Sequence, residues 1–463
     1  MEQMFMTTLP HAVQFILDEF QSAGSVGYIV GGCVRDALLG KEPNDWDICT
    51  PLTPDEVKDV FKEFQVIDTG IKHGTVTVIV DKVPYEITTF RTDGEYSDGR
   101  HPDNVTFTKS LEEDLARRDF TINAMAYNEA VGLVDIFGGC FDLRHGIIRC
   151  VRNPEERFEE DALRILRAMR FAACLGFSIE EDTANAMNDL RENLNSVSKE
   201  RISSELMKMF STTDSDSLSR IMWAHAEIFG EIIPELQMLP FKTNSVFQRF
   251  DIYSHTVEAM RTTTNDPIVR MAILFHDIGK PYFENDSTNN GHCGKSVEIS
   301  KDIMKRLRFE NNVVREVAQL IERHEYHTKL YAEDRKAISE GSMFQLRKAI
   351  HEIGFEQSIR LIAVCRANVK AHSFLDMWRY LTTLDIAEKM LYQIKNSNEC
   401  CDLKSLQISG IDLLELGVKP GKDIGRILNE LLEVVMLHPY MNQHNWLLKI
   451  AEERMKNSGN NIK

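Results

Sequence analysis

The sequence changes character near Asn153, and this change most limits what the chain can fold into. Before Asn153, short apolar runs of strand length alternate with amphipathic helical segments, and after it the pattern is helical to the end. No linker rich in Pro, Gly or Ser separates the two regions. This order predicts an α+β protein, with an N-terminal mixed sheet and helices followed by an all-helical remainder. At 463 residues the chain has room for about three domains of ~150 residues.

The stretch Tyr28–Thr50 combines a glycine turn with a pair of carboxylates. A short apolar run leads into Gly31 and Gly32 and then into a short helix, whose first backbone N–H groups point toward any bound anion. Asp45 and Asp47 follow, and residues two apart on a strand project from one face. Adjacent carboxylates repel each other unless cations bridge them, and two Mg²⁺ ions are the usual solution in phosphoryl transfer. Either feature alone is common in turns and loops, but together they predict a nucleoside triphosphate site.

Four further segments predict the elements around this stretch. Amphipathic helices are expected at Pro10–Gly24 and Thr53–Phe64, and a β-hairpin at Gly74–Val80 and Tyr85–Phe90. Glu86 on the second hairpin strand is a candidate third catalytic carboxylate. A surface glutamate on an edge strand is the equally weighted alternative.

The motif Arg117–Ala124, RRDFTINA, contains several groups that suit a nucleotide. Arginine guanidinium groups match triphosphate oxygens, whereas Asp, Thr and Asn side chains can bond a ribose hydroxyl. Taken alone, the motif could instead begin a charged helix.

A predicted helix at Glu159–Gly176 carries Asp161 and Arg164 at neighbouring positions, with Arg167 and Arg170 in the same row. An ordinary intrahelical ion pair is one interpretation. The other is base selection, because cytosine and adenine both present an amino donor beside a ring-nitrogen acceptor. A carboxylate beside a guanidinium accepts this edge, whereas uracil and guanine leave the charged groups unpaired.

Composition limits the partners and the compartment. With 54 Lys and Arg against 71 Asp and Glu, the net charge is −17, so an RNA partner would need a local basic groove on an acidic protein. No stretch approaches the ~20 apolar residues of a membrane span, and the N-terminus lacks a basic targeting region, so we expect a cytoplasmic protein without membrane partners. Nine cysteines without a CxxC pair indicate reduced thiols rather than disulfides or a cysteine-rich zinc site.

Three motifs together resemble the class II tRNA nucleotidyltransferase and bacterial poly(A) polymerase family: GGCVRD with NDWDICT, RRDFTINA, and EEDALR. The resemblance implies a nucleotidyltransferase-type head in which Asp45 and Asp47 hold Mg²⁺ and act in catalysis. It also implies a flexible loop at Thr92–Pro102 that acts as a lid. The implied nucleotide-binding residues are Gly31, Gly32, Arg35, Arg118, Asp119, Asn123, Asp161, Arg164, Arg167 and Arg170.

Residues 250–330 hold a second set of polar residues, the histidines His255, His276, His292 and His324 with Asp277 directly after the second. Their order resembles the HD phosphohydrolase superfamily, whose metal tetrad would comprise His255, His276, Asp277 and a distal aspartate. This chain has Asn368 at the expected position of that aspartate. An amide carries no charge and binds a divalent cation less well, so a structural HD-like unit is favoured over a hydrolytic one.

The predicted domains are a catalytic head at 1–150, a helical neck with the nucleotide-selecting motif at 151–240, an HD-like body at 241–375 and a tRNA-binding tail at 376–463. The predicted function is addition of C, C and A to the tRNA 3′ end from CTP and ATP, templated by the protein and dependent on Mg²⁺. Poly(A) polymerase and an enzyme that adds only CC or only A are the alternatives within the family. An HD-type phosphohydrolase is the alternative from another class, and the sequence does not indicate an oligomeric state.

Overall fold

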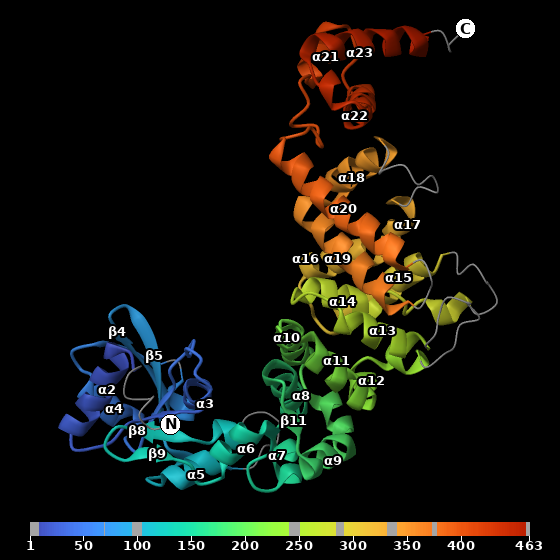
Figure 1. Cartoon of the computed structure of the whole chain (residues 1–463). Helices are drawn as coiled ribbons and strands as arrows, with labels where there is room; N and C mark the ends of the chain where they lie inside the picture. Colours follow the sequence, from blue (N-terminus) through green and yellow to red (C-terminus); the bar gives the residue numbers. More distant parts are fainter. Residues whose placement is uncertain are drawn as a thin grey trace. The chain divides into compact units, whose positions relative to one another are not determined.

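The computed structural model describes residues 9–68, 70–94, 104–239, 251–283, 291–330, 340–372 and 377–459. The chain divides into two compact units, Met1–Pro234 and Glu235–Lys463, which run from blue to green and from green to red in Figure 1. Most of the predicted lid, residues 95–102, lies outside the described residues. The described part confirms an α+β chain, with a mixed sheet near the N-terminus and helices over most of the rest.

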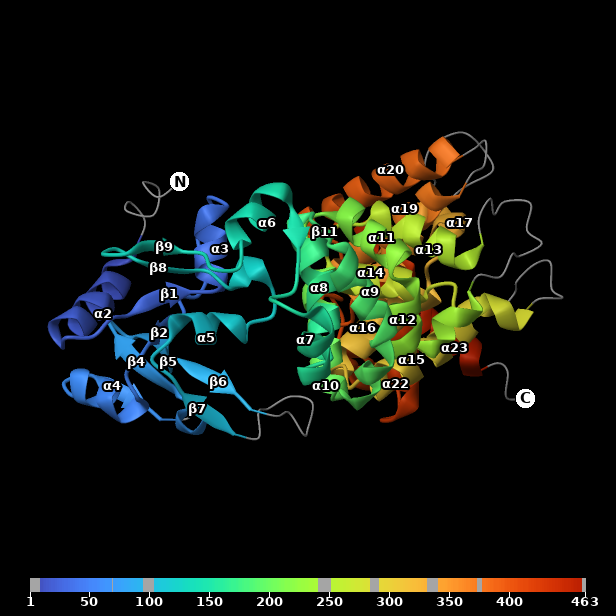
Figure 2. The ribbon, with the colours of Figure 1, turned by 90° about the horizontal axis from the view of Figure 1, so that it is seen from below.

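A seven-stranded sheet organises the first unit, in the order β3-β4-β5-β2-β1-β8-β9. Figure 2 shows β9, β8, β1 and β2 in succession across it. Only β2 and β5 pair in parallel, and the other neighbours are antiparallel, so the sheet is mixed as predicted. The strands are β1 (Tyr28–Val30), β2 (Ile48–Thr50), β3 (Gln65–Ile67), β4 (Thr75–Val80), β5 (Val83–Thr89), β8 (Ala126–Asn128) and β9 (Gly132–Val134).

The predicted hairpin is present as β4 and β5, but its turn is shorter than expected. Val83 pairs with Val80, so the turn contains only Asp81 and Lys82, at φ values of 51° and 68°. Two successive residues with positive φ match the twist of the flanking strands and make a tight two-residue connection.

Two helices of the first unit form at the segments predicted for them. The helix α2 (His11–Ser22) buries its apolar stripe, including Phe20. The helix α4 (Pro54–Val60) begins with a capping box, in which the Thr53 hydroxyl accepts from the Glu56 backbone and the Glu56 carboxylate accepts from Thr53. The remaining short elements described before residue 150 are α3 (Gly32–Leu38), η1 (Ile71–His73), β6 (Arg91–Asp93), β7 (Val105–Phe107), α5 (Leu111–Ala116), η2 (Thr121–Asn123), α6 (Gly139–His145) and β10 (Ile147–Ile148).

The helix predicted over Glu159–Gly176 is two helices, and this part of the prediction is wrong. The helix α7 (Pro154–Glu160) ends before Asp161, whose backbone is extended at φ −150° and ψ 100°. The Asp161 carboxylate then accepts the Leu163 N–H at 3.1 Å, at the start of α8 (Leu163–Leu175). Aspartate competes in this way with the helical backbone, which breaks the helix.

Helices complete both units. The first unit continues with β11 (Ser178–Ile179), α9 (Glu181–Asp189), α10 (Lys199–Phe210), α11 (Ser215–Ala224) and α12 (Ala226–Ile232). The second unit contains α13 (Ile252–Arg261), α14 (Pro267–Phe275), α15 (His292–Arg306), α16 (Asn311–Glu322), α17 (Tyr326–Leu330), α18 (Glu340–Ile353), α19 (Phe355–Ala371), α20 (Met377–Asn396), α21 (Gly410–Glu415), α22 (Lys422–Leu437) and α23 (His444–Gly459). Across the described ranges, no helix has both the length and the apolar composition that crossing a bilayer requires.

Candidate active site

A pocket of ≈ 610 Å³ in the first unit is lined by segments that lie far apart in the sequence. They are the turn after β1, the segment before β2, the RRDFTINA motif, and the helices α8 and α10. The residues predicted for nucleotide and metal binding that line it are Gly31, Gly32, Arg35, Asp45, Asp47, Arg118, Asp119, Asn123, Asp161, Arg164, Arg167 and Arg170.

The charge of this pocket is opposite to that of the chain. Its lining contains seven arginines, at positions 35, 117, 118, 164, 167, 170 and 201, against four aspartates, at positions 45, 47, 119 and 161. An excess of fixed positive charge in a concave site concentrates anions there. The pocket therefore suits a polyphosphate, although the whole chain carries a net charge of −17.

The turn after β1 needs glycine at position 31. Gly31 has a φ of +83°, and a Cβ there would lie 3.0 Å from Arg118 Nη1 and 4.0 Å from Asp47 Oδ2. A side chain would strain the backbone and displace the arginine. Glycine thus allows the backbone, Arg118 and the carboxylate to approach one another closely.

Asp45 and Asp47 stand just before β2 rather than on it, because the strand begins at Ile48. The Val30 N–H donates to the Asp47 carbonyl oxygen at 3.0 Å, which ties this extended segment to β1. Desolvation raises the pKa of the Asp47 carboxyl, Arg118 opposes this shift, and the charge of Asp45 adds to it. A divalent cation would relieve the repulsion between the two carboxylates, so this donor set fits a metal.

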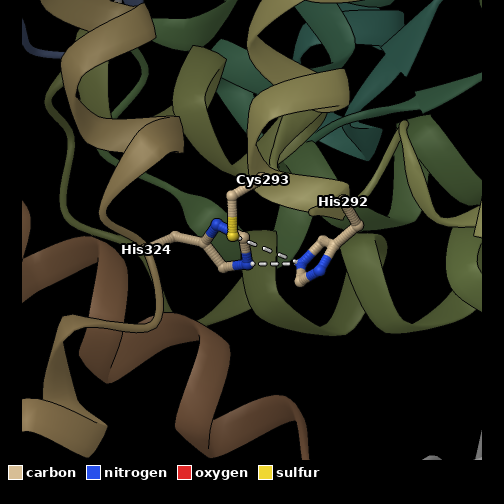
Figure 3. A group of neighbouring side chains, drawn as sticks. All are labelled: His292, Cys293 and His324. Atoms are coloured by element: carbon tan, nitrogen blue, oxygen red, sulfur yellow. Dashed lines mark hydrogen bonds between the residues drawn. The ribbon is translucent and has the colours of Figure 1, made fainter. Parts of the chain in front are cut away.

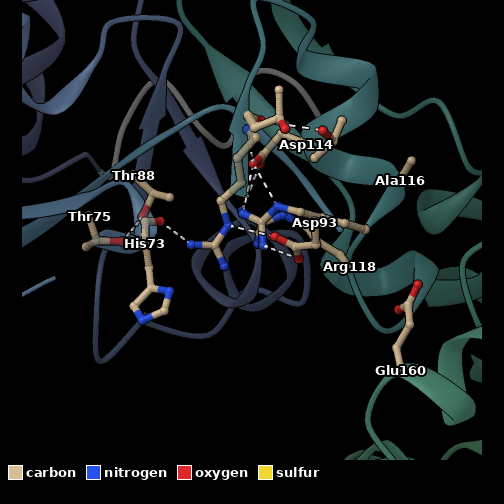
Figure 4. A network of polar contacts seen from close by, with 12 residues as sticks. His73, Thr75, Thr88, Asp93, Asp114, Ala116, Arg118 and Glu160 are labelled. Carbon is tan, nitrogen blue, oxygen red and sulfur yellow. Dashed lines mark hydrogen bonds and ion pairs between the residues drawn. The ribbon is translucent and has the colours of Figure 1, made fainter. Parts of the chain in front are cut away.

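Buried carboxylates hold the two arginines of RRDFTINA in place (Figure 4). Asp114 on α5 is fully buried and lies 2.8 Å from Arg117 Nη2 and 3.4 Å from Arg118 Nη2. Burial alone would raise the pKa of Asp114, but Arg118 and Arg117 hold it below its usual value. Asp93 on β6 lies 3.7 Å from Arg117 Nη1. The guanidinium groups are therefore positioned before any ligand binds.

A hydrogen-bonded chain links the motif to α3 and α8. Arg35 Nη1 donates to Asn123 Oδ1 at 2.7 Å, and Asn123 Nδ2 donates to Asp119 Oδ1 at 3.1 Å. Arg167 donates to Asp119 Oδ2 through Nε at 2.9 Å and Nη2 at 2.5 Å. Burial opposes ionisation, but Arg167 and Asn123 lower the pKa of Asp119 to about 2. Both oxygens of Asp119 are thus engaged, and this carboxylate orients Asn123 and Arg167.

The predicted base-selecting residues face the same pocket but are not ion-paired with each other. Asp161 Oδ2 accepts from Arg201 Nη2 at 2.6 Å, and Asp161 Oδ1 accepts from Arg201 Nη1 at 3.2 Å. Arg164 Nη1 donates to Glu160 Oε2 at 2.5 Å and to the Arg157 carbonyl oxygen at 3.0 Å. Each of the two predicted residues therefore has its own positioning partner.

Comparison with known proteins shows which family this chain belongs to. Three family models match the chain: "Poly A polymerase head domain" over residues 27–149, "Probable RNA and SrmB- binding site of polymerase A" over 176–239, and domain 2 of tRNA nucleotidyltransferase over 292–451. The CCA-adding enzyme of Ligilactobacillus salivarius is 33% identical over 450 residues, which cover 95% of this chain and 96% of the relative. The chain belongs to the CCA-adding enzyme family.

Other CCA-adding enzymes support this membership. The Enterococcus faecalis relative is 48% identical over 209 residues, which are 44% of this chain and 51% of the relative. The crystal structure of the Bacillus stearothermophilus CCA-adding enzyme in complex with CTP aligns with a TM-score of 0.70 at 26% identity, covering 97% of this chain and all of that one. The Thermotoga maritima CCA-adding enzyme complexed with tRNA shares the fold, with a TM-score of 0.62 at 20% identity and 98% of each chain covered.

In this CCA-adding family member, the structure bears on one alternative that the sequence left open and adds one residue that the sequence analysis did not name. Glu86 is exposed on β5, opposite Thr77, and is not among the residues that line the pocket, so the structure favours its surface alternative. Arg201 was missed, because its only sequence signal is Glu205 four residues later. Such a spacing suggests an intrahelical pair, but Glu205 Oε2 instead accepts from Arg170 Nε at 2.6 Å.

The residues of the predicted HD-like site lie together in the second unit of this family member. His255, His276, Asp277 and Asn368 are all buried. His255 Nε2 donates to Asn368 Oδ1 at 3.0 Å, and Lys280 Nζ lies 2.5 Å from Asp277 Oδ2. Burial lowers the pKa of His255 to about 3, which keeps the ring neutral. Within the described residues, His276 Nε2 and Asp277 Oδ1 have no hydrogen-bond partner, so the cluster is only partly satisfied, and the structural role favoured from the sequence stays a prediction.

His292 and His324, the two further histidines named from the sequence, also lie together in the second unit. Both are buried, and their Nε2 atoms are 3.2 Å apart. Figure 3 shows these two side chains and that of Cys293 turned toward one another.

Proposed function

We propose that this chain adds C, C and A to the 3′ end of tRNA from CTP and ATP, with release of pyrophosphate. One observation carries the proposal: Asp45 and Asp47 line the same arginine-rich pocket as Asp161 and Arg164. Its volume of ≈ 610 Å³ lies within the ~300–1,000 Å³ of small-molecule sites. Membership of the CCA-adding enzyme family supports this reaction, as do the related structures with CTP and with tRNA.

In the proposed mechanism, Asp45 and Asp47 would hold Mg²⁺. Bound Mg²⁺ supplies charge neutralisation on the triphosphate and lowers the pKa of the attacking tRNA hydroxyl. The backbone at Gly32 and the guanidinium groups of Arg35 and Arg118 bind the phosphates. This arrangement orients the α-phosphorus for in-line attack, with pyrophosphate on the opposite side.

Base selection in this proposal depends on Asp161 and Arg164. The Asp161 carboxylate accepts the amino hydrogen of cytosine or adenine, and the Arg164 guanidinium donates to the neighbouring ring nitrogen. The bidentate contact from Arg201 supports this role, because it fixes the plane of the Asp161 carboxylate. The protein itself would then act as the template.

We further propose the division into a head (1–150), a neck (151–240), an HD-like body (241–375) and a tRNA-binding tail (376–463). The basic pocket supports tRNA and nucleotide binding by an otherwise acidic chain. A role in tRNA maturation supports a cytoplasmic location.

One assay tests the proposed reaction. A labelled tRNA that ends before CCA is offered CTP alone, then CTP with ATP. We expect two C residues and a stop in the first case, and a complete CCA end in the second. A growing poly(A) tail with ATP would favour poly(A) polymerase, and a product that lacks A would favour a CC-adding enzyme. No incorporation from either nucleotide would refute the proposal.

A further inference from the structure

One aromatic ring lies among the arginines of the nucleotide pocket. Phe171 on α8 is 7% exposed and is the only aromatic side chain among the described residues that line this pocket. The guanidinium carbons of Arg35, Arg167 and Arg170 lie over its ring, at 5.1, 5.5 and 4.1 Å from the ring centroid. We propose that Phe171 is a positioning residue, whose ring holds these three arginines in place to bind the triphosphate. This inference rests on the proposed function, because it takes the ligand to be a nucleoside triphosphate.

The distances from the ring are those of cation–π contacts. A guanidinium within about 6 Å of a ring centroid is attracted by the negative charge on the ring face, and the attraction is stronger where water is excluded. The Arg35 and Arg170 side chains are only 11% and 16% exposed, whereas the Arg167 side chain is 33% exposed. We therefore expect Arg170, which is nearest to the ring, and Arg35 to depend on Phe171 most.

Carboxylates hold the edges of the same three guanidinium groups. Each group has one carboxylate partner: Asp36 for Arg35 at 2.8 Å, Asp119 for Arg167 at 2.5 Å and Glu205 for Arg170 at 2.6 Å. A carboxylate binds the nitrogen atoms at the edge of a guanidinium, whereas an aromatic ring contacts its flat face. The carboxylates therefore offset the gathered positive charge, and the ring limits the tilt of each guanidinium about its carboxylate contact.

The ring of Phe171 is itself held by the RRDFTINA motif. Phe120 of this motif is fully buried, and its ring centroid lies 5.8 Å from that of Phe171 at an interplanar angle of 79°. This edge-to-face arrangement is a favoured one for aromatic pairs. Phe120 directly follows Asp119, whose carboxylate binds Arg167. The same short segment therefore fixes the ring and one of the arginines over it.

An ordered set of arginines should bind a polyphosphate more tightly than a mobile set. A side chain that is already ordered loses less conformational entropy when it binds its ligand. Leucine at position 171 would still fill apolar space, but it lacks the negative ring face that attracts the guanidinium groups. Phe171→Leu should therefore weaken binding of the triphosphate by roughly tenfold.

Calorimetric titration of the full-length protein tests the proposal, with inorganic tripolyphosphate and CTP as ligands at constant Mg²⁺. We expect Phe171→Leu to weaken both ligands by roughly tenfold, and to raise the KM for CTP with little change in kcat. Phenylalanines with one, two and three ring fluorines at position 171 give a sharper readout. Fluorine withdraws charge from the ring face with little change in shape, so both affinities should fall stepwise with each added fluorine.

Phe20→Leu is the matched control. Phe20 is also fully buried and makes an edge-to-face contact with Phe61, at 5.3 Å and 83°, but it does not line the pocket. It should leave both affinities within about twofold. Equal weakening by Phe20→Leu and Phe171→Leu would overturn the inference, as would affinities that do not change with fluorination. If Phe171→Leu fails to fold, the fluorinated variants decide the question.

Tripolyphosphate binding also separates this inference from the proposed function. A parent protein that shows the fluorine trend but adds no nucleotide to tRNA would refute the proposed function and keep the role of Phe171. A parent protein that completes the CCA end but shows no fluorine trend would refute the role of Phe171 alone.

Discussion

Replacement of Arg201 is expected to impair nucleotide selection although Arg201 need not touch the nucleotide. Arg201 donates to both oxygens of Asp161, at 2.6 and 3.2 Å, and the two side chains are only 20% and 13% exposed. Solvent screening of this pair is therefore limited. Hydrogen bonds to charged groups contribute about 1.5–3 kcal/mol. At about 1.4 kcal/mol per factor of ten, Arg201→Ala should lower kcat/KM for CTP and ATP by roughly tenfold to hundredfold.

The assay is single-turnover incorporation on tRNA that ends before CCA, with CTP and, as the competing substrate, UTP. Because a mobile Asp161 discriminates less well, the preference for CTP over UTP should fall together with the rate for CTP. Arg201→Lys keeps the charge but loses the forked contact, so its loss should be intermediate.

Arg149→Ala is a matched control, since Arg149 also contacts an aspartate, Asp142 at 3.2 Å, but does not line the pocket. It should change the rate by less than about twofold, because the Arg149 side chain is 39% exposed and does not line the pocket. The reasoning is refuted if Arg201→Ala keeps both the rate and the preference for CTP, or if Arg149→Ala lowers them equally.

Three other substitutions test separate parts of the pocket. Gly31→Ala forces a side chain into a turn at φ +83°, where its Cβ would lie 3.0 Å from Arg118 Nη1. The displaced guanidinium should raise the KM for CTP by roughly tenfold. The depressed pKa of Asp119, about 2 against 3.8, stabilises the fold by about 2 kcal/mol above pH 4, and this contribution is lost as the pH falls toward 2. The unfolding free energies of Asp119→Asn and the parent protein, followed in urea, should therefore differ at pH 7 and converge at low pH. Glu86→Ala should retain its activity, and a loss of more than about a hundredfold would restore Glu86 as a third catalytic carboxylate.

Local patterns predicted the elements that depend on short stretches of chain. The turn at Gly31 and Gly32 was expected between a strand and a helix, and the helix after Thr53 was expected from its amphipathic pattern. The gathering of Asp45, Arg118 and Asp161 in one pocket was reached through the motifs and the family resemblance, rather than through spacing alone.

The ion pair between residues far apart in sequence and the break between α7 and α8 could not be predicted from local patterns. A continuous helix was expected around Asp161, so Arg164 was taken as its partner. The carboxylate of Asp161 instead caps α8, and its ionic partner Arg201 lies 40 residues away in the sequence.

Single-turnover CMP transfer by Asp45→Ala, measured beside its affinity for tRNA, tests the central claim most directly. If Asp45 and Asp47 hold the metal beside the bound triphosphate, transfer should fall by at least about a thousandfold while tRNA binding stays within about twofold. Retained transfer would contradict the account, because the chemistry would then not depend on this carboxylate pair.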